Sequence, residues 1–425
     1  MATESSIMDS NSFKEEYASM LSPKTREMIS KREKYLGGAY RLFYRKPLNI
    51  VRGEGDYLWD DEGNKYLDMY NNVAGVGHCN PAVVNAVTEQ MKTLNTHTRY
   101  LHEKILDYSE ELLALMPDEI NKIMYMCTGS EANDLALRVA EAYTGGTGII
   151  ITQEAYHGTS ALTSGCSPSL GAGQPLLPNV RLITAPDYYR HGGTSEEFTA
   201  WYASEMQKTI DELNEAGYKF SCFLADSIFS SDGIYPDPVG FLKATVDVVH
   251  KNGGVFIADE VQPGFARTGQ AFFGFARQED VLAAFSDKLP YFNTFGGNPV
   301  SIAAAQAVLK YIKDENLQEH CKKAGTALLK ALKEVQERHP ESVGDVRGAG
   351  LFLGFEFVKN DGNKTPDKDM ALNVIEMLRD EHILTSVIGH YGNILKLRPP
   401  MVFSENDIDW FATSLDKCIT KLENK

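Results

Sequence analysis

The sequence predicts an α/β protein, with a large domain built on a mostly parallel, doubly wound sheet and a smaller α+β domain at its C-terminal end. In the middle of the chain, apolar strand-like runs alternate with segments of helical periodicity, which is typical of βαβ units. From about Asn298 onward the order changes, because two successive helical patterns precede two strand-like runs. Neither internal repeats nor low-complexity segments interrupt this plan.

Three regions are expected along the chain. Residues 1–75 form an arm and a small hairpin that packs with the small domain, and the hairpin is predicted by "DYLWDDEGNKYLDMY" (56–70), with a Glu-Gly turn at its centre. Residues 76–298 form the large domain, and residues 299–425 form the small C-terminal domain.

The elements of these domains follow from periodicity. In the large domain, helices are predicted at 82–95, 103–116, 130–143 and 241–253. Strands are predicted there at 148–152, 181–185, 220–226 and 254–261, with a further strand-like stretch at 124–127. In the small domain, helices are predicted at 299–312, 327–339 and 404–424, and strands at 350–358 and 394–401.

The composition, 43% hydrophobic and 24% charged, is ordinary for a globular protein. A net charge of −16 argues against nucleic-acid or acidic-membrane binding, and no apolar run is long enough to cross a bilayer. The acidic N-terminal segment resembles neither a secretory signal nor a transit peptide, and the six cysteines are scattered without a C-x-x-C pair. We therefore expect a cytoplasmic protein with no nucleic-acid partner, no membrane partner and no bound metal.

Groups that suit an anionic, aromatic cofactor follow several of the predicted strands, where open parallel sheets bind their ligands. In "MYMCTGSEAND" (124–134), the turn at Thr128, Gly129 and Ser130 leads directly into a helix. The free N–H groups of a helix N-terminus can bind a phosphate. An ordinary N-cap would use the same residues, so both interpretations stay open here.

Two loops offer similar groups. "EAYHGTS" (154–160) places Tyr156 and His157 at the expected carboxyl edge of the sheet, where a planar ring can stack on a heteroaromatic cofactor. A core aromatic next to a surface histidine is the alternative. "YFNTFGGNPVS" (291–301) contains two glycines just before a helix, and it suits either a phosphate or a tight loop.

Asp259 ends the apolar run of "GGVFIADEVQ" (253–262). A carboxylate buried at the end of such a strand is costly unless it has a partner. It can hold a pyridine nitrogen protonated, which makes the ring an electron sink. The alternative is a structural carboxylate that caps a helix or pairs with an arginine such as Arg267.

Taken together and in this order, the motifs resemble the class III pyridoxal-phosphate-dependent aminotransferases, from about residue 40 to the C-terminus. The similar stretches are "LWDDEGNKYLDMYNNVAGVGHCNP", "CTGSEAND", "AYHG", "FIADEVQPGFARTG", "TFGGNP" and "LKLRPPM". They are most similar to the branch of ethanolamine-phosphate phospho-lyase and alanine–glyoxylate aminotransferase 2-like proteins. The resemblance implies the PLP-dependent transferase fold of type I, pyridoxal 5′-phosphate (PLP) as cofactor, and a homodimer whose sites are shared between chains.

The resemblance also implies roles for individual residues. Asp259 and Tyr156 would be catalytic, the first pairing with the ring N–H and the second stacking on the ring. The phosphate would be bound by Gly129 and Ser130, and Thr294 would reach the phosphate in the neighbouring subunit. The complete set implied to bind the cofactor is Gly129, Ser130, Tyr156, His157, Asp226, Asp259, Gln262 and Thr294.

Two positions depart from the family pattern. Asp226 stands where the family usually has glutamate, and Lys396 stands where it usually has a carboxylate-binding arginine. Lys396 and Arg398 are the implied substrate-binding residues, and they share one face of a strand because they are two positions apart. A lysine is a poorer bidentate clamp for a carboxylate than an arginine. Gln262 would lie near the 3-oxygen of the cofactor.

Chemistry of this class needs a lysine that forms a Schiff base with the cofactor. The family segment that carries this lysine is missing near residues 278–281. Lys288 is the only lysine between Lys251 and Lys310, and it is a weak candidate because its own surroundings match a surface position of the family. A solvated loop lysine is the alternative.

The sequence therefore predicts an aminotransferase that moves an amino group from a small amine donor to a 2-oxo acid. One alternative is a phospho-lyase that acts on an amino alcohol phosphate. Another is a catalytically inactive protein with the PLP fold, because the lysine segment is missing.

Overall fold

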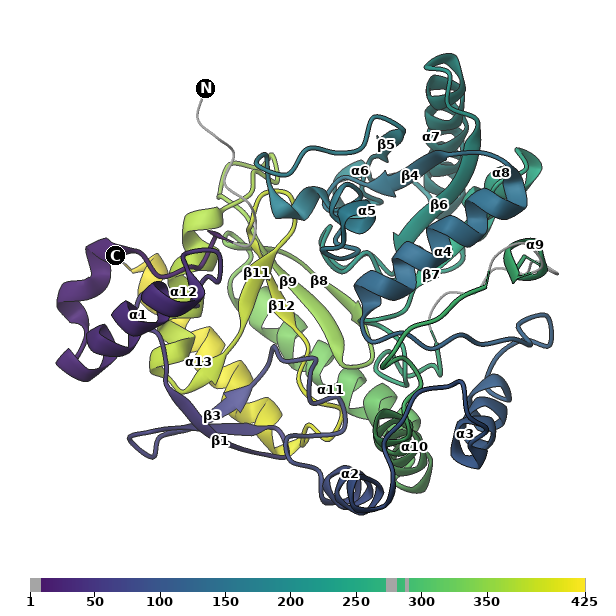
Figure 1. The fold of residues 1–425 in the computed structure, drawn as a ribbon. Coiled ribbons are helices and arrows are strands. Elements are labelled where there is room, and N and C mark those ends of the chain that lie inside the picture. The colour runs from purple at the N-terminus through teal and green to yellow at the C-terminus, as the bar shows by residue number, and fades with distance from the viewer. Residues whose placement is uncertain (1–8, 273–280, 287–289, 425) are drawn as a thin grey trace. The chain divides into compact units, whose positions relative to one another are not determined.

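The computed structural model describes residues 9–272, 281–286 and 290–424 (Figure 1). The chain divides into two compact units, which we describe separately. Unit 1 consists of Met1–His78, Leu170–Ala172 and Lys323–Lys425, and unit 2 consists of Cys79–Ser169 and Gly173–Lys322. The contact division thus falls at 78/79 and 322/323, whereas the domain boundaries predicted at 75/76 and 298/299 remain predictions.

Unit 2 contains a four-stranded sheet in which all described strands run parallel. Its order is β5 (Val180–Ile183), β4 (Gly148–Thr152), β6 (Phe220–Asp226) and β7 (Val255–Asp259). The predicted α/β fold class is confirmed. The predicted strand-like stretch at 124–127 is wrong, because residues 123–127 are assigned to no strand.

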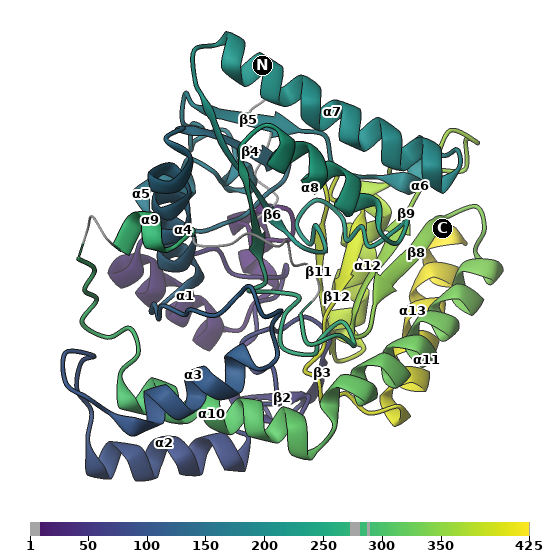
Figure 2. The same ribbon diagram turned by 90° about the vertical axis from the view of Figure 1, so that its right-hand side faces the viewer.

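Helices cover both faces of this sheet, as in a doubly wound fold. Helix α4 (Gly129–Thr144) lies on one face, and α7 (Ser195–Glu215) and α8 (Phe241–Lys251) lie on the other (Figure 2). Alternate strand residues explain this, because Ile149, Ile151 and Leu224 pack with α4, whereas Ile150 and Phe223 pack with α7 and α8. Because both faces are covered, the strands are almost entirely apolar.

The two strands at one side of this sheet differ in burial. All seven residues of β6 are buried, whereas the three central residues of β7 are only half-buried. Among the described residues, β7 pairs with β6 and with no other strand. In the described part of the chain the sheet therefore ends at β7, although the apolar run there is typical of an interior strand.

The remaining described helices of unit 2 form a helical layer and short connections. α10 (Pro299–Asp314) packs against α2 (Pro81–Thr93) and α3 (Glu103–Leu113). The short helices are α5 (Ala161–Ser164), α6 (Tyr188–His191), α9 (Ala283–Ser286) and the 3-10 helix η3 (Pro168–Leu170). Helices α2 and α10 each start with a proline after an asparagine N-cap, and α3 starts with a glutamate. These residues favour helix initiation.

Unit 1 contains two further sheets. The first is ordered β1 (Ile50–Glu54), β2 (Tyr57–Asp60), β3 (Lys65–Asp68) and β10 (Ile383–Leu384), and only the β3–β10 pair is parallel. The second is antiparallel, ordered β11 (Ser386–Ile388), β12 (Ile394–Leu397), β9 (Phe352–Phe357) and β8 (Val343–Ala349). The helical elements are η2 (Glu15–Met20), α1 (Pro23–Leu36), α12 (Lys368–Asp380) and α13 (Asn406–Glu423), and α11 (Leu317–Arg338) starts in unit 2.

The predicted hairpin is present between β2 and β3. The carboxylate of Asp60 accepts hydrogen bonds from the N–H groups of Glu62 and Asn64 at 3.0 and 2.9 Å, and from the hydroxyl of Tyr66 at 3.0 Å. One carboxylate thus satisfies the polar groups of the turn. No described helix is long and apolar enough to cross a membrane.

Candidate active site

Asp259 is the last residue of β7, and its carboxylate is held by donors from three segments. Its Oδ2 accepts hydrogen bonds from Asn133 Nδ2 at 2.8 Å and from His157 Nδ1 at 2.9 Å. Its Oδ1 accepts the N–H of Val261 at 3.1 Å. Burial works to raise the pKa of Asp259, but the hydrogen bonds from His157 and Asn133 outweigh it and hold the pKa below its ordinary value. The carboxylate is therefore ionised and fixed in direction.

The loop after β4 carries Tyr156 and His157 to this carboxylate. The N–H of His157 donates to Ser167 Oγ at 2.9 Å, and the N–H of Thr159 donates to Ser130 Oγ at 3.0 Å. Between them, Gly158 has a φ of +134°, and a Cβ there would lie 2.4 Å from Ser130 Oγ. Only glycine permits this close approach of the loop to α4.

The first turn of α4 provides the predicted phosphate-binding groups. Thr128 is the N-cap, and its side chain accepts the N–H of Glu131 at 3.1 Å. Ser130 Oγ accepts the N–H of Thr159, so its own hydrogen can be donated to a phosphate. A Cβ at Gly129 would lie 2.9 Å from Val261 Cγ2, which places the helix start next to the residues that follow β7. The N-cap and the phosphate interpretations are therefore compatible.

The other predicted cofactor residues of unit 2 occupy different environments. Tyr156 and Gln262 are half-buried, and Thr294 is exposed. Asp226 ends β6 directly beside Asp259, but its carboxylate accepts the N–H of Ile228 at 3.0 Å and the hydroxyl of Ser230 at 2.6 Å. The described contacts of Asp226 thus hold the loop that follows β6, and its cofactor role stays a prediction.

Lys396 and Arg398 belong to unit 1, and both are buried. Their cationic groups each lie 5.5 Å from the ring centroid of Phe352. The guanidinium of Arg398 also donates to the main-chain oxygen of Tyr70, at 3.2 Å from Nε and 3.0 Å from Nη2. The two cations therefore share one aromatic neighbour, as their two-residue spacing predicts.

Lys288 and most of the segment 278–281 lie outside the described residues. Two residues that the sequence motifs did not indicate, Asn133 and Asp232, also hold this region. Asp232 accepts the hydroxyl of Thr152 at 2.6 Å and the N–H of Glu154 at 2.9 Å, so it holds the start of the Tyr156 loop. Asn133 could have been found, because it lies four positions after Gly129 on one face of a predicted helix.

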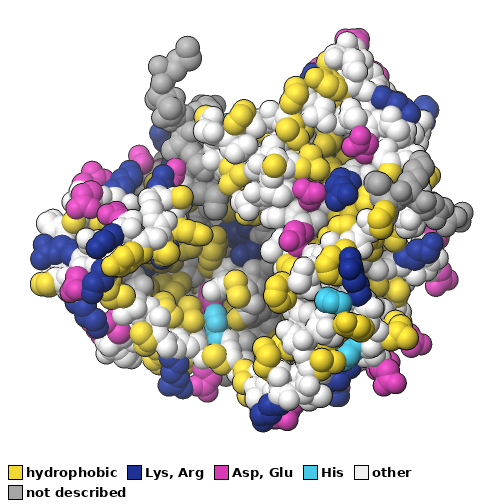
Figure 3. All heavy atoms as spheres, in the orientation of Figure 1, with side chains coloured by type: hydrophobic (Ala, Val, Ile, Leu, Met, Phe, Trp, Pro, Cys, Tyr) yellow, Lys and Arg dark blue, Asp and Glu magenta, His cyan; other side chains and the backbone are white. Residues whose placement is uncertain are grey.

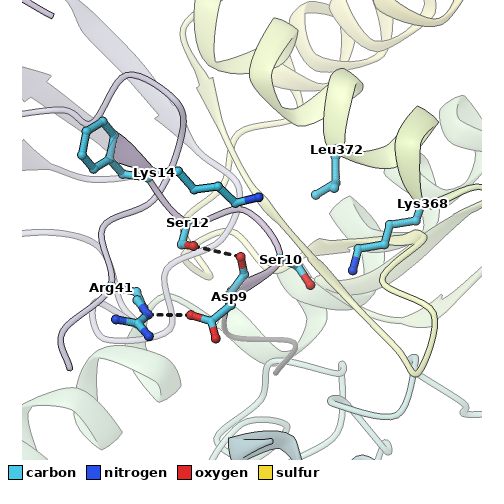
Figure 4. Close-up of a pocket in the computed structure, with 8 residues that line it drawn as sticks. Asp9, Ser10, Ser12, Lys14, Arg41, Lys368 and Leu372 are labelled. Carbon is cyan, nitrogen blue, oxygen red and sulfur yellow. Dashed lines mark hydrogen bonds and ion pairs between the residues drawn. The ribbon is translucent and has the colours of Figure 1, made fainter. Parts of the chain in front are cut away.

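A separate hollow of about 380 Å³ lies in unit 1. Lys14 and Lys368 both extend into it beside Ser10, while Arg41 pairs with Asp9 (Figure 4). None of the predicted cofactor or substrate residues lines it. It is therefore a surface feature distinct from the site at Asp259.

The sequence profile of the family described as aminotransferase class-III matches this chain over residues 43–281 and 274–419. The chain belongs to the class III aminotransferase family. The chain is 36% identical to alanine–glyoxylate aminotransferase 2-like of Drosophila melanogaster, over 93% of this chain and 87% of that protein. It is 32% identical to ethanolamine-phosphate phospho-lyase homolog 1 of Caenorhabditis elegans, over 93% of each chain.

A solved structure supports the same assignment of this class III aminotransferase family member. A phospholyase from Arthrobacter, in complex with phosphoethanolamine, superposes with a TM-score of 0.88 at 34% identity, covering 92% of this chain and 99% of that one. The predicted fold type I is thereby confirmed, as is the resemblance to both named branches.

The alignment with the Drosophila relative also reveals residues that this chain lacks. The alignment spans 430 positions but includes 93% of the 425 residues here, which is about 395, so about 35 positions face gaps in this chain. The two family matches meet and overlap at 274–281. The overlap agrees with a missing segment near 278–281, whereas the unmatched positions are a total for the whole alignment.

Enzymes of the class III family depend on PLP. The residues at the end of β7 fit this cofactor, because an ionised, buried carboxylate suits a protonated ring nitrogen. The N-terminus of α4, with the hydroxyl of Ser130, suits the phosphate. Gly129, Ser130 and Asp259 would hold opposite ends of one flat molecule, and Tyr156 lies on the loop between them in the hydrogen-bond network.

Proposed function

We propose that this protein is an aminotransferase that transfers an amino group from a small amine to a 2-oxo acid. The observation that carries the proposal is the ionised carboxylate of Asp259, buried and fixed by Asn133 and His157. Several relatives that are 30% or more identical are named as aminotransferases, which favours this reaction over others of the fold.

Each residue of the proposed site would have its own role in this reaction. PLP supplies an electron-withdrawing ring on which the substrate amine can lose a proton. Asp259 holds the proton on the ring nitrogen, Ser130 and the start of α4 bind the phosphate, and Tyr156 covers a ring face. Loop contacts to Ser130 and Ser167 fix Tyr156 and His157 in advance of binding, which lowers the entropy cost of ordering them.

The missing segment limits what this chain would do by itself. The overlap of the two family matches at 274–281 and the edge position of β7 in the described sheet both support the absence of a segment beyond β7. That segment carries the cofactor-linking lysine in the family. We therefore propose that the chain binds PLP weakly and without a covalent bond, and that it is catalytically inactive until the segment is present.

A second candidate reaction is elimination of phosphate from an amino alcohol phosphate. It is favoured by the phospholyase from Arthrobacter with bound phosphoethanolamine and by Lys396, since an ammonium serves a phosphate better than it clamps a carboxylate. Arg398 would add a second positive charge, because it neighbours Phe352 together with Lys396.

We also propose a homodimer, in which Thr294 would reach the cofactor phosphate of the partner. Around Thr294 the surface of unit 2 exposes large apolar side chains, including Phe295 at 64%, Phe292 at 43% and Leu106 at 62%. A hollow of about 310 Å³ lies beside them, lined by Tyr125, Tyr291 and Phe292 among others. Figure 3 shows hydrophobic side chains next to histidines over the region of α3. Exposed apolar patches of this kind mark interfaces.

Location in the cytoplasm stays a prediction. All six cysteines are free, which a reducing compartment favours. Fractionation of cells that express the tagged protein would test it.

The deciding experiment restores the segment of a relative at position 278 and offers phosphoethanolamine, an ω-amino acid and alanine, each with a 2-oxo acid. Both inorganic phosphate and transferred amino groups are measured. Amino transfer without phosphate release supports the aminotransferase, and phosphate release from phosphoethanolamine that is lost in Lys396→Ala supports the phospho-lyase. Neither product from the restored chain would contradict both proposals. For the chain as written, borohydride trapping of PLP on Lys288 would show that this lysine is catalytic after all.

A further inference from the structure

Asn133 is buried in the first turns of α4 and uses its side-chain amide to join two other segments. Its Nδ2 donates to the main-chain oxygen of His157 at 3.0 Å and to Asp259 Oδ2 at 2.8 Å. The amide nitrogen carries two hydrogens, so one is available for each acceptor. Only 6% of the residue is exposed. Replacing these hydrogen bonds by bonds to water would therefore cost free energy.

These two bonds complete a closed network of three groups. His157 donates from Nδ1 to the same Oδ2 of Asp259, at 2.9 Å, while its main-chain oxygen accepts from Asn133. The network thus links α4, the loop after β4 and the end of β7. Because two donors hold Oδ2 and the N–H of Val261 holds Oδ1, the plane of the carboxylate is fixed.

We propose that Asn133 is a positioning residue that aims the Asp259 carboxylate at the nitrogen of a bound pyridine ring. This rests on the proposed function, in which Asp259 keeps that nitrogen protonated. Without Asn133, the carboxylate loses one of the three donors that fix its plane, and its direction is less restricted because its terminal torsion has broad minima. The protonated ring then loses part of its stabilisation.

Asn133 also connects the two ends of the proposed site. Ser130, three positions earlier on the same helix, accepts the N–H of Thr159, so α4 holds one loop at two points. Residues three apart lie on the same helix face. One rigid helix therefore fixes both the phosphate end and the ring-nitrogen end of the site. For this reason we expect the amide of Asn133 to affect the direction of the Asp259 carboxylate as well as the stability of the fold.

The test uses 4-deoxypyridoxine 5′-phosphate, which carries the ring nitrogen and phosphate of PLP but has no aldehyde, so it needs no lysine. The ultraviolet spectrum of the bound probe is followed against pH to obtain the pKa of its ring nitrogen. In Asn133→Ala we expect this pKa to fall by about one unit, the effect of losing one hydrogen bond to a charged group. Asn133→Ser is measured in parallel, since its small polar side chain keeps one donor and should give a smaller fall.

Two controls separate positioning from a structural effect. Thr144→Val removes a hydrogen bond between the other end of α4 and Ser221, so it should lower the melting temperature without changing the ring pKa. In the Asp259→Asn background, Asn133→Ala should add almost nothing, because the two residues act through one group.

An unchanged ring pKa in Asn133→Ala, a fall in Asn133→Ser that is as large as in Asn133→Ala, or a fall that persists undiminished in the Asp259→Asn background would overturn the inference and leave the cofactor site standing. If the unsubstituted chain fails to bind the probe at all, both the inference and the proposed cofactor site are wrong.

Discussion

Strands β6 and β7 are neighbours with similar sequences, yet they meet different surroundings. They pair in parallel from Cys222 with Val255 to Asp226 with Asp259. β6 is buried along its whole length, whereas the centre of β7 is half-exposed on the described surface. An apolar strand that is left half-exposed indicates a missing neighbour. The difference therefore points to the place where a further segment of the family fold belongs.

The two aspartates that end these strands show a second difference. The carboxylate of Asp226 accepts donors from its own loop, at Ile228 and Ser230. The carboxylate of Asp259 accepts donors from two distant segments, through Asn133 and His157. Equal residues at equal positions thus have different hydrogen-bond donors, from the following loop at Asp226 and from two distant segments at Asp259.

The largest expected effect compares Phe223 in β6 with Phe256 in β7, which face each other in register with ring centroids 5.6 Å apart. Phe223→Ala should lower the free energy of unfolding by about 3–5 kcal/mol, because it leaves a cavity in a buried core. Phe256→Ala should cost less than half as much, because its side chain is already partly in water. Urea denaturation of both variants measures the difference, and equal losses would show that β7 is covered in solution.

A second prediction concerns pH and the loop that follows β6. Burial raises the pKa of Asp232 from 3.8 to about 7. Between these values the folded chain keeps a proton that the unfolded chain has released, so this group makes the free energy of unfolding fall as pH rises from about 4 to 7. Relative to Asp232→Asn, which does not titrate, the unsubstituted chain should lose up to about 4 kcal/mol across that range, at about 1.4 kcal/mol per unit.

Denaturant titrations of both proteins at several pH values test this. A constant difference between them from pH 4 to 8 would mean that Asp232 is ionised throughout. If the free energy of unfolding of the unsubstituted chain, relative to Asp232→Asn, instead falls as the pH drops below 4, the pKa of Asp232 is lowered and not raised.

A third prediction separates the two aspartates. Asp226→Ala leaves buried donors of its own loop unsatisfied and should cost about 1–3 kcal/mol in stability. Asp259→Asn keeps an acceptor for His157 and should cost less, but in the chain with the restored segment it should lower turnover by about 10²–10³. Melting temperature and turnover are measured on both. Near-normal turnover in Asp259→Asn would show that Asp259 is structural.

The smallest expected effect is at Ser130, the contact between α4 and the Tyr156 loop. Ser130→Ala removes the acceptor for the N–H of Thr159, at a cost of about 0.5–1.5 kcal/mol. It should also weaken binding of inorganic phosphate, followed by calorimetry, if the start of α4 is the phosphate site. Loss of stability with unchanged phosphate binding would leave only the N-cap interpretation.

The sequence was sufficient for most of the fold, because β4 and β6 have the predicted bounds and the apolar run of β7 lies within its predicted range. It failed at 124–127, where the apolar residues have strand character but no described neighbour to pair with, and a strand needs a partner that local sequence does not supply. Helices α1, α7 and α12 and strands β1, β8, β10 and β11 were not predicted. In the site, the motif indicated Asp259 and His157. Asn133 could have been found from its spacing on α4, whereas the contacts of Asp232 join two loops that meet only after folding.

The open edge of β7 also bears on the fate of the chain after synthesis. In the described structure its outer N–H and C=O groups face no strand, and the apolar side chains between them are half in water. Such an edge is a template on which another chain can add a strand. Pairing of two copies through β7 therefore competes with correct folding, so the yield of correctly folded protein falls as the rate of synthesis increases. A slow supply of chains, or a chaperone that covers β7, would keep more of them apart.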